Sequence, residues 1–219
     1  NRKDLTQIPF VTIDGADAKD FDDAVFCNLN DKTFILDVAI ADVAEIVKLD
    51  SALNKEAMQR GTSIYFPSKV IPMLPEKISN NLCSLVPNEV RNVLVCEMIF
   101  SLSGEMKSYK FFEARIKSHK RMTYNEVEDF IKNQKLNASK SIKNSLDSLN
   151  ILTKSLLVKR NKRQALEIDS QEPILNINKN GKVEQISLPQ RLYAQQMIEE
   201  SVLAANVCAA SFMTKHYKY

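Results

Sequence analysis

The sequence predicts an α+β protein in which a mixed β-sheet is flanked by helices. Three observations support this class. Short apolar stretches separated by turn residues fill residues 1–121, amphipathic helical patterns dominate the rest, and strands and helices do not alternate strictly. The 219 residues are 44% hydrophobic and contain only 4 Gly and 7 Pro, which indicates a packed core rather than a disordered chain.

Three short strands are expected first, at residues 9–14, 24–29 and 33–40. A helix at residues 50–60 follows, because Asp50 or Ser51 can cap its start and Gly61 can end it. These patterns place the first helix after a compact group of strands.

The middle of the chain predicts a strand at residues 62–66 and then a proline-containing loop at residues 67–87. Such a loop is long for a compact domain and suggests a functional surface. Residues 92–102 and 106–121 should form a hairpin that turns at Ser103-Gly104.

The second half predicts helices at residues 124–133, 140–163 and 190–214. The long middle helix follows from apolar residues that recur every 3.5 residues on average: Ile142, Leu146, Leu149, Thr153 and Leu156. Two strands at residues 173–178 and 182–187 should meet at the hairpin turn Asn180-Gly181.

Composition narrows the class of protein. The four cysteines form no Cys-x-x-Cys pair, so they predict buried core residues in a reducing compartment, the cytoplasm, and disfavour zinc. We expect no membrane segment, because no apolar stretch is long enough, and nothing requires more than a monomer. The absence of an initial Met suggests a piece of a longer protein.

Five aspartates are packed between Asp14 and Asp23, and apolar stretches flank them on both sides. Carboxylates this close repel one another, so either some are protonated or a cation lies among them. Oxygen ligands without His or Cys favour Mg²⁺ or Mn²⁺ over zinc. Because the net charge is +3, the rest of the chain is basic and suits a polyanionic substrate.

Other interpretations of this segment are a calcium loop or a solvated charged turn. An EF-hand loop starting at Asp20 would need an acidic residue or Asn where Ala24 stands, and no Gly follows. The residues alone leave the reaction open among phosphatase, nuclease and polymerase. Histidine-based ribonuclease chemistry is disfavoured, because neither His119 nor His216 has a nucleophile nearby in sequence.

The aspartate segment resembles the catalytic signature of the ribonuclease II and ribonuclease R family, the RNB exoribonucleases. Further segments match in the family's order and cover almost the whole chain. The sequence around Tyr65 and Ser118 resembles the ribonuclease R branch more than the ribonuclease II branch. These segments are Val38-Ala39-Ile40-Ala41-Asp42-Val43, Arg60-Gly61-Thr62-Ser63-Ile64-Tyr65-Phe66-Pro67, Val70-Ile71-Pro72-Met73-Leu74-Pro75, Leu82-Cys83-Ser84-Leu85, Ser118-His119-Lys120-Arg121-Met122-Thr123-Tyr124 and Met197-Ile198-Glu199-Glu200.

The resemblance implies a processive 3′→5′ hydrolase that degrades single-stranded RNA to nucleoside 5′-monophosphates with Mg²⁺, or Mn²⁺, by a two-metal type of mechanism. It assigns metal binding and catalysis to Asp14, Asp20, Asp22 and Asp23. Asp22 matches the residue whose loss abolishes catalysis while largely sparing binding. Asp17 falls at a position with small polar residues in the family and is not expected to bind metal directly.

The resemblance also implies that three residues bind RNA. Tyr65 matches the aromatic residue that stacks on the last nucleotide, a contact that tolerates any base. Tyr124 and Glu199 match residues associated with ribose recognition, with Glu200 as the neighbouring alternative to Glu199; a contact to the 2′-hydroxyl would favour RNA over DNA. Without the resemblance, a packed aromatic and a solvated glutamate would be the ordinary interpretations.

The chain also departs from the family pattern. Ile168 stands where better-studied members have a phenylalanine that partners the stacking tyrosine, so the clamp is expected to be one-sided. The family's catalytic arginine would lie beyond Tyr219. We therefore expect residues 1–219 to be the N-terminal and central part of one RNB catalytic domain with little activity alone, without the flanking oligonucleotide-binding (cold-shock, S1) domains.

Two groups of basic residues are candidates for phosphate contacts. The first alternates along the expected strand at residues 106–121, and the second ends the long helix. Solvated surface is the more common explanation for each. The groups are Arg115, Lys117, His119 and Arg121, and Lys159, Arg160, Lys162 and Arg163.

Two alternatives to an exoribonuclease remain. A catalytically silent RNA-binding regulator could use the same scaffold, although the complete aspartate set disfavours it. An unrelated phosphohydrolase would act on small nucleotides rather than on polymers.

Overall fold

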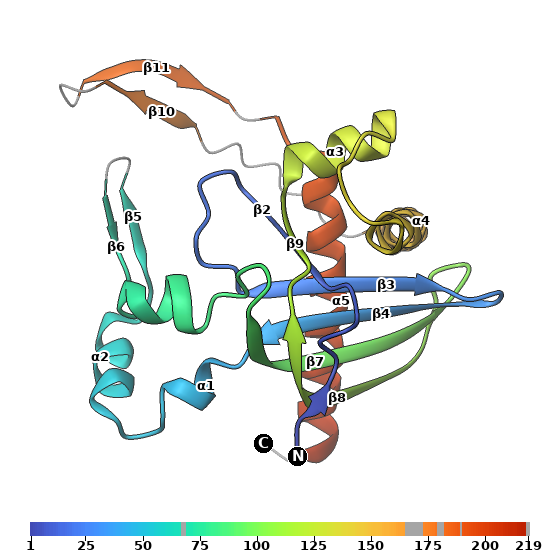
Figure 1. Ribbon diagram of the computed structural model, residues 1–219, viewed down its shortest axis with the longest axis horizontal. Helices are drawn as coiled ribbons and strands as arrows, with labels where there is room; N and C mark the ends of the chain where they lie inside the picture. Colours follow the sequence, from blue (N-terminus) through green and yellow to red (C-terminus); the bar gives the residue numbers. More distant parts are fainter. Residues whose placement is uncertain (67–68, 165–172, 179–181, 189, 218–219) are drawn as a thin grey trace.

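The computed structural model describes all residues except 67–68, 165–172, 179–181, 189 and 218–219. A seven-stranded sheet forms its centre, in the order β1-β8-β7-β4-β3-β2-β9 (Figure 1). Its strands are β1 (Lys3–Asp4), β2 (Val11–Asp14), β3 (Asp23–Leu29), β4 (Thr33–Ala41), β7 (Val90–Ser101), β8 (Met106–Lys117) and β9 (Lys120–Thr123).

The sheet is mixed and strongly curved. Neighbouring strands from β8 through β7, β4 and β3 to β2 run antiparallel, whereas β9 runs parallel to β2 and β1 runs parallel to β8. Only two residues separate β8 from β9, although these strands lie near opposite ends of the strand order. The sheet must therefore curl back on itself to bring these strands together.

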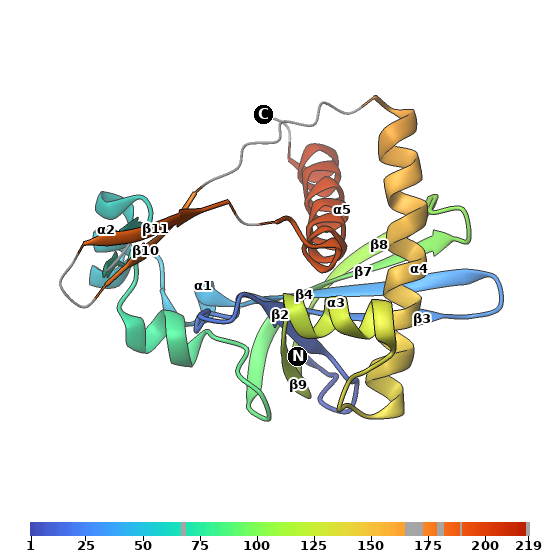
Figure 2. The same ribbon diagram turned by 90° about the horizontal axis from the view of Figure 1, so that it is seen from above.

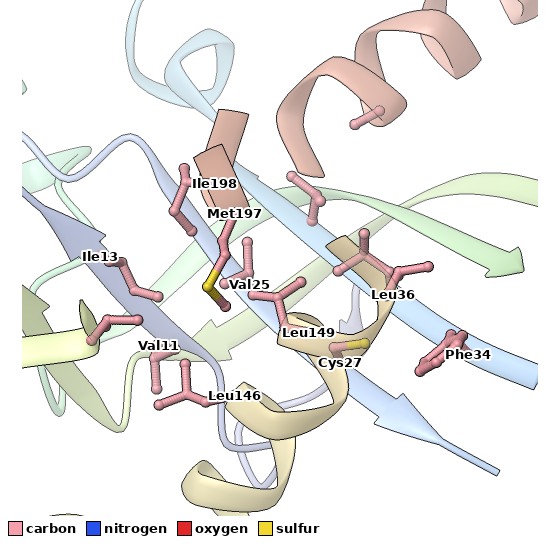
Figure 3. Packing of buried hydrophobic residues seen from close by; sticks show 14 of the residues in the cluster. Val11, Ile13, Val25, Cys27, Phe34, Leu36, Leu146, Leu149, Met197 and Ile198 are labelled. Carbon is pink, nitrogen blue, oxygen red and sulfur yellow. The ribbon is translucent and has the colours of Figure 1, made fainter. Parts of the chain in front are cut away.

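Three helices cover one face of the sheet: α3 (Tyr124–Asn133), α4 (Lys140–Lys162) and α5 (Tyr193–His216) (Figure 2). Between them and the sheet lies the larger hydrophobic core, to which β4 contributes Phe34, Leu36 and Val38 (Figure 3). Leu146 and Leu149 of α4 enter this core from the helical layer. The expected amphipathic pattern of the long helix is therefore confirmed.

A second, smaller core lies on the other side of β4, where Ala39 and Ala41 point. It is completed by Phe10, Phe21 and a segment around Ile78, and it lies beneath the loop that carries the aspartates. The elements at this end are α1 (Val43–Ile46), α2 (Ala52–Arg60), the π-helix η1 (Ile78–Leu82) and the two-stranded sheet of β5 (Ile64–Phe66) and β6 (Lys69–Ile71).

Most expected elements are confirmed, including the α+β class and the hairpin of β10 (Ile174–Ile177) and β11 (Val183–Ser187). The turn residues Asn180 and Gly181 lie outside the described residues. Ser51 caps α2 by accepting a hydrogen bond from Asn54 N, and Gly61 ends the helix at φ 72°. Among the described residues, no helix is long and apolar enough to cross a membrane.

Two expectations about the middle of the chain were wrong. The loop expected at residues 67–87 contains β6 and η1, and the strand expected at residues 106–121 is divided into β8 and β9. The division occurs because the backbone changes partners: His119 N donates a hydrogen bond of 2.8 Å to Phe10 O, beside β2. The short elements β1 and α1 were not expected at all.

Candidate functional site

The aspartate loop, residues 15–22, connects two adjacent antiparallel strands. Asp14 is the last residue of β2 and Asp23 is the first residue of β3, so the sheet itself fixes both ends of the loop. The carbonyl of Asp22 accepts a hydrogen bond of 2.9 Å from Ala41 N, which extends the ladder between β3 and β4 by one step. Three of the four predicted metal ligands are thereby anchored by strand pairing.

The second half of the loop is held by Ser84, which is completely buried. The Ser84 hydroxyl accepts a hydrogen bond of 3.0 Å from Phe21 N and donates one of 2.9 Å to Lys19 O. Leu85 N donates a further bond of 2.8 Å to Phe21 O. The backbone immediately before Asp22 is therefore fixed from a segment 63 residues away.

The first half of the loop is held by Arg121 of β9. Its guanidinium donates hydrogen bonds of 2.7 Å to Gly15 O and 2.8 Å to Ala16 O. The same group lies 5.6 Å from the centre of the Phe21 ring. One side chain thus contacts both arms of the aspartate loop.

The carboxylates of the four predicted aspartates interact electrostatically with one another. Burial and repulsion from Asp20 and Asp22 raise the pKa of Asp14, although Arg121 opposes this. Burial and Asp20 raise the pKa of Asp22, and burial, Asp14 and Asp22 raise the pKa of Asp23 to about 6. Asp14, Asp22 and Asp23 therefore carry unfavourable interactions that a bound cation would relieve.

The carboxylate oxygens of the four aspartates suit one kind of Mg²⁺ or Mn²⁺ site. Among the described residues, no three His, Cys, Asp or Glu side chains form a group that could hold a metal ion by themselves. Mg²⁺ commonly binds through one or two carboxylates and fills its other positions with water and substrate phosphates. The aspartates fit such a hydrated, substrate-completed site, and they do not fit a protein-only cage of the EF-hand type.

Tyr124 lies beside the aspartates. It is the first residue of α3 and follows Thr123, which pairs with Asp14 across β9 and β2. Burial, Asp14 and Asp23 raise the pKa of Tyr124 to about 12, so its hydroxyl keeps its proton and can donate a hydrogen bond at neutral pH. The structure therefore brings this RNA-binding candidate to the metal-binding candidates.

Tyr65 lies on the separate β5–β6 hairpin and is 69% exposed. Its neighbours Ile64 and Phe66 are also exposed, so the hairpin presents apolar side chains to solvent. An exposed ring can stack on a base with little rearrangement. The fold places Tyr65 in a hairpin at the same end of the molecule as the aspartate loop.

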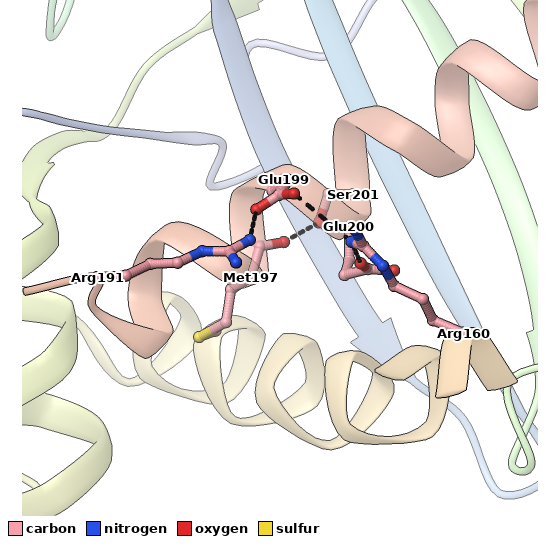
Figure 4. Close-up of polar contacts among 6 residues, drawn as sticks. All are labelled: Arg160, Arg191, Met197, Glu199, Glu200 and Ser201. Carbon is pink, nitrogen blue, oxygen red and sulfur yellow. Dashed lines mark hydrogen bonds and ion pairs between the residues drawn. The ribbon is translucent and has the colours of Figure 1, made fainter. Parts of the chain in front are cut away.

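Glu199 and Glu200 have different surroundings on α5 (Figure 4). Glu199 is exposed and forms ion pairs with Arg191 and, at 3.5 Å, with Arg160. Glu200 is only 4% exposed and pairs with Arg160 at 2.6 Å, which joins α5 to α4. The Glu200 carboxylate is buried in an ion pair, so Glu199 is the more accessible of the two candidates for ribose binding.

The expected basic stripe does not form. Arg115 and Lys117 belong to β8, and Arg121 belongs to β9. His119 Nε2 lies 2.9 Å from Thr6 O, and the Arg121 guanidinium is used by the aspartate loop. The second basic group does end α4 as expected, although its Arg160 is engaged by Glu200.

Some expected site residues lie elsewhere or were missed. Ile168, expected at the aromatic clamp, lies outside the described residues. The roles of Ser84 and Arg121 in holding the loop were not foreseen. Both lie within segments of the family resemblance, and that position was the only signal for them in the sequence. The four cysteines are buried and free, as expected.

Comparisons with known proteins agree with the resemblance. The family described as the RNB domain matches residues 2–219. Ribonuclease R of Vibrio parahaemolyticus is 45% identical over 98% of this chain and 26% of its own length. Ribonuclease R of Escherichia coli K12 is 44% identical over 98% of this chain and 27% of its own length. The chain thus spans about a quarter of the length of these relatives.

Solved structures extend the likeness to the fold. Mycoplasma genitalium RNase R in complex with ribose methylated single-stranded RNA has a TM-score of 0.95 and 36% identity, covering 98% of this chain and 34% of that one. Yeast Ssd1, a pseudonuclease, has a TM-score of 0.75 and 16% identity over 98% of this chain and 26% of that one. The second likeness concerns the fold alone.

Proposed function

This chain belongs to the RNB domain family, and from that premise we propose that it is part of the catalytic domain of a 3′→5′ exoribonuclease. The activity, substrate and partners proposed here refer to the longer protein, with flanking oligonucleotide-binding domains of the cold-shock and S1 type. We propose single-stranded RNA as the substrate, nucleoside 5′-monophosphates as the products, and a processive, cytoplasmic monomer as the working form.

The observation that carries this proposal is the complete set of four aspartates on one anchored loop and at its two ends. Asp14, Asp20, Asp22 and Asp23 would hold Mg²⁺ or Mn²⁺, and their mutual repulsion supports cation binding. When bound, two such ions would supply activation of a water molecule and neutralise charge on the leaving oxygen. The Asp22 side chain is partly desolvated yet still reaches solvent, which leaves the site open to a substrate phosphate.

The other residues would orient the RNA. Tyr65 would stack on the terminal base, which gives affinity without sequence preference. Tyr124 would donate its hydroxyl proton in a hydrogen bond near the reacting phosphate or ribose. Glu199 would reach the ribose only by exchanging one of its two arginine partners, because both ion pairs use its carboxylate.

A silent RNA-binding regulator is the alternative, and the likeness to a pseudonuclease shows that the fold alone does not decide catalysis. The test is to incubate the full-length protein and Mg²⁺ with RNA labelled at its 5′ end or internally, with and without EDTA. We expect internally labelled RNA to yield mononucleotides from the 3′ end and EDTA to stop their release. Retention of intact RNA with Mg²⁺ would establish the regulator, and turnover of free nucleotides alone would indicate a small-molecule phosphohydrolase.

The Tyr65→Ala variant should bind the 3′-terminal nucleotide less tightly by about 1–3 kcal/mol, or about 5- to 150-fold, because one base loses its stacking partner. Affinity for a short single-stranded oligoribonucleotide in EDTA measures this loss. Tyr65→Phe should retain the affinity, and Tyr217→Ala provides a matched control at another exposed tyrosine. Equal affinities of Tyr65→Ala and wild type would remove Tyr65 from the site.

Stabilisation by Mn²⁺ should increase from about pH 5 to about pH 7, because cation binding requires deprotonated carboxylates. The folded-state pKa of Asp23, about 6, exceeds its ordinary value of 3.8. The metal-free protein therefore loses stability as pH rises from about 4 to about 6, since the unfolded chain binds fewer protons there. Bound Mn²⁺ should recover this loss, and the difference in Tm with and without Mn²⁺ measures it.

Asp37 provides the control for this pH dependence. Burial and Glu97 raise the pKa of Asp37 to about 7, so it contributes a pH dependence of the same sign outside the aspartate loop. Asp37→Asn should remove that contribution and leave the Mn²⁺-dependent difference unchanged. An equal Mn²⁺ effect on Tm at both pH values would contradict the metal assignment.

A further inference from the structure

The aspartate loop depends on side chains from other elements for its shape. Between Asp14 and Asp23 the structure assigns no regular helix or strand, and the hydrogen bond from Ala18 N to Gly15 O is long at 3.3 Å. Asp20 and Asp22 lie on this segment, beside Asp14 and Asp23 at its two ends, and repulsion among these carboxylates would push the segment outward. Some group must therefore oppose that movement before any cation arrives.

Arg121 has the geometry for this role. It pairs with Thr12 across β9 and β2, so its backbone is tied to the strand that leads into the loop. Its two bonds to the carbonyls of Gly15 and Ala16 fix the start of the loop, and its contact with Phe21 reaches the other arm. Phe21 is only 8% exposed and belongs to the smaller core, which makes it a firm support.

The hydrogen-bond acceptors of Arg121 distinguish a positioning role from simple charge neutralisation. Among the described residues, Arg121 forms no ion pair within 4.0 Å, although its charge opposes the rise in the pKa of Asp14. An arginine that only neutralised the cluster would pair directly with a carboxylate. Arg121 instead bonds to carbonyl oxygens, which leaves the carboxylate oxygens free for a cation. The buried Nε of Arg121 has no hydrogen-bond partner among the described residues.

We propose that Arg121 is a positioning residue that holds the aspartate loop in the shape required for divalent cation binding, without contacting the cation. Ser84 performs the matching task on the second arm. Its own backbone is fixed by Arg91, whose guanidinium donates bonds of 3.1 Å to Ser84 O and 3.1 Å to Asn81 O. This proposal rests on the function proposed above for the same loop.

The test compares Arg121→Met and Arg121→Lys in the full-length protein. Calorimetric titration with Mn²⁺ in the absence of RNA gives the cation affinity directly, and the Mg²⁺ concentration for half-maximal RNA hydrolysis gives it during turnover. We expect Arg121→Met to weaken both by about 10- to 100-fold, the range found when the outer support of a metal ligand is removed. Arg121→Lys should be intermediate, because an ammonium can bond to carbonyls but lacks the planar fork.

Arg115→Met is the matched control, since Arg115 is an exposed arginine on β8 that pairs with Asp4 at 3.4 Å. It should leave both cation measurements unchanged. Affinity for RNA in EDTA and Tm without metal should change little in Arg121→Met. The proposal is overturned by wild-type Mn²⁺ affinity in Arg121→Met, or by a parallel loss of cation affinity, RNA affinity and Tm, which would indicate unfolding.

The two proposals can fail separately. A wild-type protein that releases no mononucleotides would refute the exoribonuclease function, yet the Mn²⁺ titrations would still compare Arg121→Met with Arg115→Met. Conversely, RNA hydrolysis with equal Mg²⁺ dependence in wild type and Arg121→Met would refute only the positioning role.

Discussion

Asp22→Asn in the full-length protein should reduce RNA hydrolysis by at least about 10³-fold while leaving RNA affinity within a few-fold of wild type. The amide keeps the shape of the side chain but removes the negative charge that would bind the cation. The loop should keep its conformation, because the hydrogen bond from Ala41 N uses the Asp22 backbone. Single-turnover release of mononucleotides and oligoribonucleotide binding in EDTA measure the two effects.

Asp17→Asn is the matched control for this variant. Asp17 is an exposed aspartate on the same loop and is not expected to bind the cation directly. The same chemical change should therefore leave hydrolysis near the wild-type rate. Near-normal degradation by Asp22→Asn, or an equal loss in both variants, would show that Asp22 is not at the catalytic centre.

Glu200→Ala should lower the free energy of unfolding by about 3 kcal/mol, because it leaves the guanidinium of Arg160 without its closest partner between α4 and α5. The side chains of Arg160 and Glu200 are only 17% and 5% exposed, so water replaces the lost carboxylate poorly. Glu199 at 3.5 Å offers partial compensation and keeps the expected loss at the lower end of the usual range. Urea denaturation followed by circular dichroism measures the change.

Two further variants separate the contribution of the ion pair to stability from that of its surroundings. Glu199→Ala should cost less than about 1 kcal/mol, since that carboxylate is exposed to solvent. Replacing the whole pair, with Arg160→Met and Glu200→Leu together, should recover much of the stability lost in Glu200→Ala. A Glu200→Ala protein as stable as wild type would mean that the pair does not join the two helices.

Elements with local signals could be predicted from the sequence. The helix α3 begins at Tyr124 and ends at Asn133 as expected, because Thr123 and Glu126 form a capping box four residues long. The aspartate cluster was equally visible, since five like charges within ten residues require an explanation wherever they fold. In both cases the residues that decide the outcome are neighbours in sequence.

Features that depend on distant residues could not be predicted. The partner of Phe21 N is Ser84, 63 residues away, and nothing near either residue indicates the contact. Arg121 was expected on a basic strand face because alternation was assumed to continue from β8. The change of partner at His119 depends on β2, which the local pattern does not contain. Sequence therefore located the carboxylates, and only the fold revealed what holds them.

The most direct test is the location of Mn²⁺ by anomalous diffraction in crystals of the full-length protein bound to a short RNA. Ions should appear about 2.0–2.3 Å from carboxylate oxygens of Asp14, Asp20, Asp22 and Asp23, beside the terminal phosphodiester. Ions bound elsewhere, with these four side chains directed into bulk solvent, would contradict the account.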